Sequence, residues 1–203
     1  MSITSESSAD ADPSAEPMST VPGAPLDWEG REYSSIEDHD RLAPFLMAVV
    51  SSTDAWMFLS SVGVPAAGRR SPASSLFPYQ TDDRLHDSAG VAGPHTSVRV
   101  TRGGATTLWR PLDPRGRETF RLERRLLKTT HCEAVMFEER NLDLGLTFRA
   151  SWEASRRFGW IRRAEVVNES EDASIEILDG LLGLMPADAD RSMQTELSTL
   201  LDA

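Results

Sequence analysis

The chain has 203 residues, of which 39% are hydrophobic and 26% are charged. These values are typical of one globular domain of ordinary size, and they exclude a wholly disordered chain and a bundle of membrane helices. The formal net charge of -11 would repel a phosphate backbone. We therefore expect no nucleic-acid partner.

A single cysteine, Cys132, excludes an intrachain disulfide and a CxxC metal pair. No apolar run reaches the roughly 18 residues that cross a bilayer, and the N-terminus has no signal-peptide pattern. The histidines have neither HxH nor HExxH spacing. We therefore expect a cytoplasmic protein that has no membrane partner, binds no metal and carries no other cofactor.

Residues 1–26 are rich in Ser, Pro, Ala and acids and nearly lack aliphatic side chains, which predicts a disordered acidic tail before a domain over residues 27–203. Acids gather at both ends: residues 1–30 carry a net charge of -6 and residues 164–203 carry -9, whereas residues 31–163 carry +4. The arginines of the middle are expected to pair with the C-terminal acids, although these acids could also serve a partner surface.

Short apolar or alternating runs follow one another along the chain, separated by turns that contain Gly, Pro and Asp. No helical pattern of ten residues lies between them, so we expect a mainly β fold, an antiparallel β-sandwich. Helix is expected only over residues 36–50 and 190–201. The expected strands cover residues 55–61, 97–101, 107–112, 120–126, 134–139, 144–152, 159–168 and 173–178.

The C-terminal stretch places Met193, Leu197, Leu200 and Leu201 at helical spacing. No capping glycine or closing strand follows before Ala203. We therefore expect the chain to be cut off rather than finished.

Several short strings stand in a fixed order along the chain. Two are fairly specific, FPYQTDD at residues 77–83 and FEERNLDLGL at residues 137–146. In this order the strings resemble the N-terminal region of the cellobiose phosphorylase-like proteins of the six-hairpin glycosidase group. The accompanying strings are STD at 52–54, GRR at 68–70, FGWIR at 158–162, VNES at 167–170 and LDGL at 178–181.

The resemblance implies a galactose-mutarotase-like β-supersandwich that precedes an (α/α)6 barrel. In that family the sandwich continues beyond the position that matches Ala203, so we expect the sandwich of this chain to be incomplete. In that family the barrel holds the catalytic acid and the site where phosphate or water attacks, so no catalytic residue carries over to this chain. We expect a non-catalytic fragment of a glycoside phosphorylase- or hydrolase-like protein, with roles at a domain interface and in carbohydrate contact. The alternatives are a free-standing carbohydrate-binding module and a protein-interaction β-domain.

Glycoside chemistry needs two carboxyl groups placed across a sugar. Glu138 and Glu139 are neighbours in a strand and point to opposite faces, so they cannot both reach one ligand. They and the pair Asp82-Asp83 are expected to face water or to anchor loops. A mutarotase-like reaction would need Glu138 with His86 or His95, and the spacing adds no support for that pairing.

The candidates for carbohydrate or interface contact are Tyr79, Asp82, Asp83, Trp109, Asn141 and Asp143. The two aspartates 82 and 83 are expected to close a turn, and Asn141 and Asp143 to hold a neighbouring loop. Trp109 is expected to be exposed, whereas the tryptophans in apolar alternations, Trp56, Trp152 and Trp160, are expected in the core. The expected partners are a carbohydrate, a second chain that carries a helical barrel, or a second copy of this chain.

Overall fold

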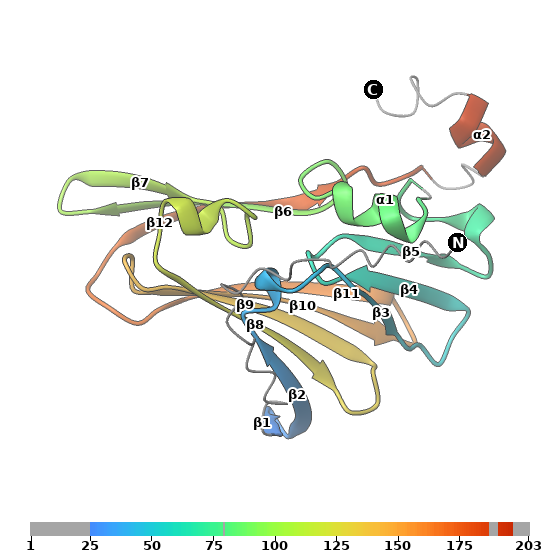
Figure 1. Cartoon of the computed structure of the whole chain (residues 1–203), viewed down its shortest axis with the longest axis horizontal. Helices are drawn as coiled ribbons and strands as arrows, with labels where there is room; N and C mark the ends of the chain where they lie inside the picture. Colours follow the sequence, from blue (N-terminus) through green and yellow to red (C-terminus); the bar gives the residue numbers. More distant parts are fainter. Residues whose placement is uncertain (1–24, 79, 187–190, 197–203) are drawn as a thin grey trace, which may run out of the picture.

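A computed structural model of the chain describes residues 25–78, 80–186 and 191–196. Within this part, twelve strands pair antiparallel and form two facing layers (Figure 1). The expectation of a mainly β, antiparallel β-sandwich is confirmed. Neither α-helix in the described residues is long and apolar enough to cross a membrane.

The lower layer is one six-stranded sheet in the order β1-β2-β8-β9-β10-β11. Four consecutive hairpin-connected strands, β8 to β11, form most of it. The strands β1 and β2 curl under its outer face, where Trp28 lies 4.3 Å from the guanidinium carbon of Arg149. The strands are β1 (Leu26–Trp28), β2 (Arg31–Glu37), β8 (Leu122–Thr129), β9 (Ala134–Asn141), β10 (Leu146–Ser155) and β11 (Gly159–Asn168).

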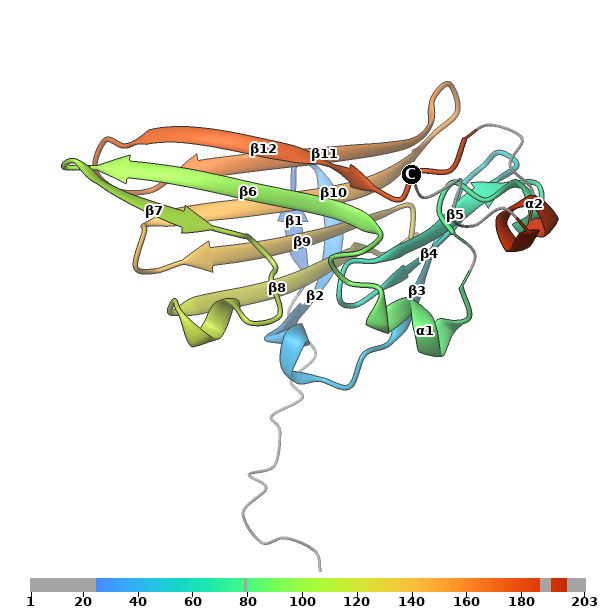
Figure 2. The same cartoon turned by 90° about the horizontal axis from the view of Figure 1, so that it is seen from above.

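The upper layer is divided into two three-stranded sheets that lie side by side over the large sheet (Figure 2). One has the order β12-β6-β7, with β6 at its centre, and the other has the order β3-β4-β5. The strands are β3 (Leu46–Val49), β4 (Ala55–Ser60), β5 (Pro65–Arg69), β6 (Gly93–Arg102), β7 (Ala105–Trp109) and β12 (Ser174–Leu182).

Each small sheet buries its own apolar cluster against the large sheet. Beneath β3-β4-β5 the cluster is formed by Met47, Val49, Met57, Leu59, Ala67, Phe77, Leu126, Val135, Phe137 and Trp152. Beneath β6 and β7 it is formed by Val98, Val100, Trp109, Leu146, Phe148 and Ala150. The seam between the two small sheets therefore lies above the boundary between the two clusters.

The helix expected over residues 36–50 is wrong. This stretch completes β2, makes the 3-10 turn η1 (His39–Arg41) and then forms β3. In β3 only Met47 and Val49 are buried, and this alternation is hidden in the sequence because all four residues are apolar. The remaining 3-10 turns are η2 (Pro72–Ser74) and η3 (Gly116–Glu118).

The helix expected over residues 190–201 is confirmed where the structure describes it, as α2 (Arg191–Glu196). Residues 190 and 197–201 lie outside the described residues. A second helix, α1 (Asp82–Asp87), was not expected.

Each expected strand is present, with shifted ends in several of them. The strand β6 begins at Gly93 and β12 extends to Leu182, while β1, β2 and β5 were not expected. Strand β1 begins at Leu26, the last residue of the expected tail. The rest of that tail, residues 1–24, lies outside the described residues.

Arginines of the middle of the chain pair with acids of its C-terminal part, as expected from the charge distribution. These contacts join strands within and between the two layers. The pairs are Arg99 with Glu176, Arg162 with Asp179 at 2.5 Å, Arg149 with Glu165 at 3.3 Å, and Arg140 with Glu169 at 3.6 Å.

The turn between β9 and β10 packs against the loop that follows β11. Gly145 has a φ of +60°, and a Cβ at this position would lie 2.5 Å from the Cβ of Ser170. Arg102 holds the same contact by donating to the carbonyl of Leu144 (3.0 Å) and to the hydroxyl of Ser170 (2.8 Å). The strings at residues 137–146 and 167–170 therefore meet in space.

We expect Gly145→Ala to destabilise the fold more than Gly103→Ala. Both glycines have positive φ, but a Cβ at Gly103 meets nothing within 4 Å, so this variant carries only the backbone cost of about 1 kcal/mol. The overlap with Ser170 should add about 1–3 kcal/mol in Gly145→Ala. Urea unfolding of both variants measures the difference, and equal losses would contradict the packing described for this turn.

Candidate functional site

Trp109 is the last residue of β7 and points into the sandwich. Its side chain is 1% exposed, and its ring meets Phe148 edge-on at 6.4 Å between ring centres. The indole N–H donates to Oε1 of Glu139 at 2.7 Å. The expectation that Trp109 is exposed is therefore wrong, because its strand places it over β10, and it cannot serve as a surface platform for a sugar.

Asn141 and Asp143 hold the turn between β9 and β10, as expected. The side-chain oxygen of Asn141 accepts the backbone N–H of Asp143 (3.2 Å) and of Leu144 (3.1 Å). The carboxylate of Asp143 accepts the backbone N–H (2.7 Å) and the Nε–H (2.6 Å) of Arg121. These bonds from Arg121 lower the pKa of Asp143. Both side chains thus serve the local architecture.

The other three candidates are only partly covered by the structure. Tyr79 lies outside the described residues, as do the side chains of Asp82 and Asp83. The backbone of this segment forms the first turn of α1, in which the N–H of Leu85 donates to the carbonyl of Thr81 at 2.8 Å. The turn expected at residues 81–83 is therefore the start of a helix.

Glu139 is the most deeply buried carboxylate of the described residues, with 0% exposure. Its Oε1 accepts from Trp109, and its Oε2 accepts from the backbone N–H of Leu112 (3.0 Å) and from Nε of Arg124 (2.6 Å). The expectation of a water-facing acid is wrong here, whereas that of a loop anchor is confirmed, because Leu112 belongs to the loop after β7. The sequence did not reveal the three donors of Glu139, because they lie 15, 27 and 30 positions away in the chain.

Glu138 points to the opposite face of the large sheet, as the strand alternation requires. Its two carboxylate oxygens accept from Arg125 (2.5 Å) and from Arg149 (2.7 Å). Burial would raise the pKa of Glu138, but the hydrogen bonds from these arginines outweigh it and the pKa is lowered. His95 lies on the inner side of the sheet and His86 bonds Ser60 at 2.6 Å, so neither pairs with Glu138.

The ion pairs continue from Glu139 toward η1. Arg124 also reaches Asp40 (2.9 Å), and Arg117 binds both Asp40 (2.7 Å) and Asp38 (2.6 Å). Burial opposes ionisation of Asp40, but Arg117 and Arg124 lower its pKa to about 2. Beside it, His39 is 4% exposed and neither ring nitrogen has a hydrogen-bond partner in the described residues. Burial lowers the pKa of His39 to about 4.

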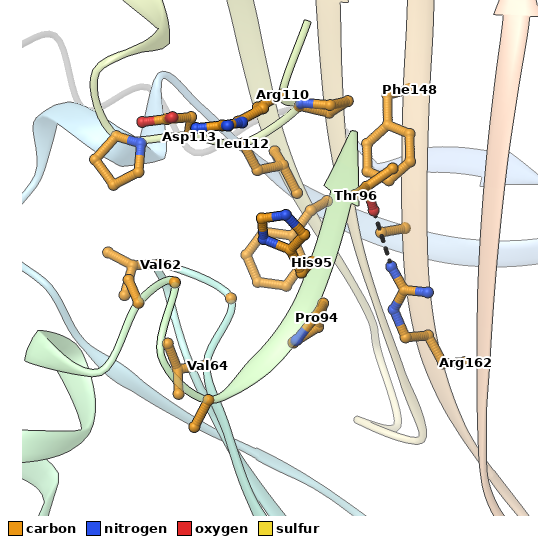
Figure 3. A pocket seen from close by; sticks show the side chains of 18 of the residues that line it. Val62, Val64, Pro94, His95, Thr96, Arg110, Leu112, Asp113, Phe148 and Arg162 are labelled. Atoms are coloured by element: carbon orange, nitrogen blue, oxygen red, sulfur yellow. Dashed lines mark hydrogen bonds between the residues drawn. The ribbon is translucent and has the colours of Figure 1, made fainter. Parts of the chain in front are cut away.

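A cavity of about 500 Å³ lies beneath the seam between the two small sheets (Figure 3). We call it the seam cavity. Its floor comes from β9 and β10, with Phe137, Phe148, Ala150 and Trp152. Its roof comes from the turn at residues 62–64, the start of β6 at residues 94–96 and the loop at residues 110–115. It therefore joins the two apolar clusters.

The polar lining of the seam cavity is mostly cationic. Arg110, Arg115 and Arg162 contribute to it, against a single acid, Asp113. Arg162 is neutralised by Asp179, which it binds at 2.5 and 2.8 Å. Over the described residues, no group of three or more His, Cys, Asp or Glu side chains is placed to hold a metal ion.

A second hollow, of about 520 Å³, lies on the outer face of β3-β4-β5. Trp56, Phe58 and Leu46 line it. Trp56 is therefore half-buried on the outside of the layer, and its expected place in the core is wrong. Trp152 is buried in the core as expected, and Trp160 packs against the same cluster from its edge.

The two layers share an open side at β11 and β12. Each of these strands pairs with one neighbour only in the described part of the chain. On β12, Ile177 is 52% exposed and Leu178 is 70% exposed. The ion pair between Arg162 of β11 and Asp179 of β12 holds the two edges above one another.

A scan against protein-family models found none that matches this chain. A search of curated proteins also found no match.

We expect Glu139→Gln to lower the free energy of unfolding by about 3 kcal/mol or more, because it leaves Arg124 buried without its main counter-charge. The matched control is Glu123→Gln, which removes an exposed partner of Arg140 at 2.7 Å and should cost less than about 1 kcal/mol. Chemical denaturation of both variants measures the difference, and a loss in Glu139→Gln no larger than in the control would contradict the anchor role.

We expect stability to fall in acid through His39. Its pKa is about 6.5 when unfolded and about 4 when folded, so its contribution is complete above pH 6.5 and is lost as the pH falls toward 4, by about 3 kcal/mol in all. Asp40 adds a second loss as the pH falls from 3.8 through about 2.

The variant His39→Phe tests the loss of stability between pH 6.5 and pH 4. Unfolding at pH 7 and pH 4.5 should differ less in this variant than in the wild-type chain, because phenylalanine does not titrate. The exposed His131 supplies the control, since His131→Phe should keep the wild-type difference. An unchanged difference in His39→Phe would show that His39 does not cause the loss.

Proposed function

We propose that this chain is a non-catalytic β-sandwich module of a carbohydrate-active, glycoside phosphorylase- or hydrolase-like protein, and that it acts by docking a further polypeptide along the open β11–β12 side. The docking role rests on the position and the exposed side chains of β12. This is an edge strand whose free side is bordered by exposed apolar residues, Ile177 and Leu178.

Strand β12 is suited to pairing with another strand. Ile177 faces inward beside the fully buried Val98 of β6, yet about half of its side chain stays accessible because none of the described strands covers its other flank. An unpaired edge presents free N–H and C=O groups together with such side chains, and proteins that leave an edge open usually protect it with charge. Addition of a strand from another polypeptide would satisfy these groups and cover Ile177.

The carbohydrate-active parentage is supported by the ordered strings and by where they lie. The string at residues 137–146 contains Glu138, Glu139, Asn141 and Asp143, and each of these side chains has a structural partner. The string at residues 167–170 contacts the end of the first one at Gly145. Such strings maintain a sandwich, which is the role that the resemblance implies for this region.

The non-catalytic role is supported by the arrangement of the candidate acids. Glu138 and Glu139 lie on opposite faces of the large sheet, and both carboxylates are held by arginines. Glycoside hydrolysis requires two acids that face each other across a sugar, one of them kept protonated by a raised pKa. The lowered pKa of Glu138 is opposite to what a catalytic acid needs.

Calorimetric titration with cello-oligosaccharides distinguishes this proposal from a carbohydrate-binding module. A docking module should give no saturable heat. Saturable heat would favour the binding module, whose platform would then lie at a surface other than the buried Trp109.

We expect the isolated chain to self-associate through its open edge and Leu178→Lys to weaken this association by about tenfold, because it replaces an exposed apolar contact of about 1.5 kcal/mol with a charge. The matched control is Leu108→Lys, an exposed leucine on β7 at the opposite edge of the same sheet. Sedimentation equilibrium measures both. A wild-type chain that stays monomeric at millimolar concentration, or equal effects of the two variants, would contradict docking at β12.

A further inference from the structure

We propose that the seam cavity is a binding site for a small organic anion, a molecule that carries a carboxylate or phosphate group on a ring-sized apolar body. This site shares Arg162 with the open β11–β12 side, but its argument does not use the docking role and is independent of the proposed function. It rests on the size and floor of the cavity, on the cations of its rim and on the way these cations are held.

The cavity has the size and floor of a small-molecule site. Its volume of about 500 Å³ falls within the range of known ligand pockets, roughly 300–1,000 Å³, which are mostly apolar with a few polar groups. Phe137, Phe148 and Trp152 supply three aromatic rings to the lining, and Ala150 leaves space among them. A flat apolar body would bury its surface against this floor.

The rim supplies positive charge that no side chain of the described residues neutralises. The side chains of Arg110 and Arg115 have neither an ion pair nor a hydrogen bond among the described residues, although both line the cavity. Guanidinium groups bind carboxylate and phosphate groups through paired N–H donors. The excess charge is local, because the whole chain carries a formal net charge of -11.

Two further polar residues line the cavity, Arg162 and Thr96, and Arg162 donates a hydrogen bond of 3.4 Å to the hydroxyl of Thr96 (Figure 3). The side chain of Arg162 is 9% exposed, and its Nε is a buried donor without a partner in the described part of the chain. Asp179 already occupies its two terminal nitrogens. Arg162 is therefore enclosed and already neutralised, and the positive charge that a ligand can reach comes from Arg110 and Arg115.

Hydrogen bonds to the large sheet fix the loop that bears Arg110 and Arg115. Glu139 accepts the N–H of Leu112, and Arg124 donates to the carbonyl of Asp113 at 2.6 Å. Leu112 has a φ of +64°, a conformation that is costly for leucine and persists only where the surroundings impose it. The buried network therefore holds the loop in one shape before any ligand arrives, which lowers the entropic cost of binding.

The first experiment titrates the full chain with phenyl phosphate and with benzoate by calorimetry. We expect saturable binding of at least one of them. Benzyl alcohol, which lacks the charge, and inorganic phosphate, which lacks the apolar body, should each bind at least about tenfold more weakly. Failure of both anions to bind, or equally tight binding of inorganic phosphate, would overturn the proposal.

The second experiment locates the site with matched variants. Arg110→Ala combined with Arg115→Ala should weaken binding of the tighter anion by about tenfold. Arg156→Ala combined with Arg157→Ala removes the same charge from the exposed turn between β10 and β11 and should change binding less than about twofold. Equal weakening by the two double variants would show a general charge effect and would overturn the assignment.

The third measurement follows the floor of the cavity and does not depend on the arginine variants. The methyl resonance of Ala150 should shift on addition of the tighter anion and stay unchanged with inorganic phosphate. Binding heat without a shift at Ala150 would place the anion elsewhere and would refute the site.

Discussion

The buried carboxylate of Glu139 in β9 links the large sheet to β7 and to the loop after β7, which none of the described strand pairings does. It accepts hydrogen bonds from β7, from the loop after β7 and from β8, and so links the upper layer to the large sheet. A buried charge is costly unless all its hydrogen-bonding capacity is used. Three donors bind the carboxylate of Glu139 here, and Arg124, one of these donors, also forms an ion pair with Asp40. The sandwich thus contains a polar connection between its layers in addition to its two apolar clusters.

The divided upper layer explains where the surface features lie. Two narrow sheets cover one wide sheet, so there is a seam between them and a margin beside β12 that no described strand covers. The seam holds the cavity, whose roof is assembled from turns and strand ends and whose floor is a regular sheet. The margin exposes Ile177 and Leu178. Both features follow from how the layers are built and need no specialised insertion.

The strands from β8 to β12 could be predicted from the sequence because their alternation is visible. In β8 the buried positions are every second residue over its first half, and turn residues separate the strands that follow. The segments β3 and α1 could not be predicted in this way. The first is uniformly apolar, and the second contains a single apolar residue, Leu85, so neither shows a period.

The candidate site was much less predictable than the strands. The local roles of Asn141 and Asp143 follow from turn chemistry, which acts over two or three residues. The buried indole of Trp109 donates to Glu139, which is thirty positions away. The residues next to Trp109 in the sequence give no indication of that contact. The seam cavity combines segments from residue 62 to residue 162. Such a combination depends on the packing of layers, which a single sequence does not display.

The adjacent acids Glu138 and Glu139 also determine how the strands of the large sheet align. Each acid has its own arginines on its own face: Arg125 and Arg149 on one, Arg124 on the other. If β9 slid by one residue against β8 and β10, each carboxylate would move to the face where the other's partners lie, and apolar and charged positions would be exchanged along the strand. A slip in either direction would bring only one of the two acids to an arginine, and the other would lie beside Glu123 or between Leu126 and Ala150. Only the observed alignment therefore pairs both carboxylates at once.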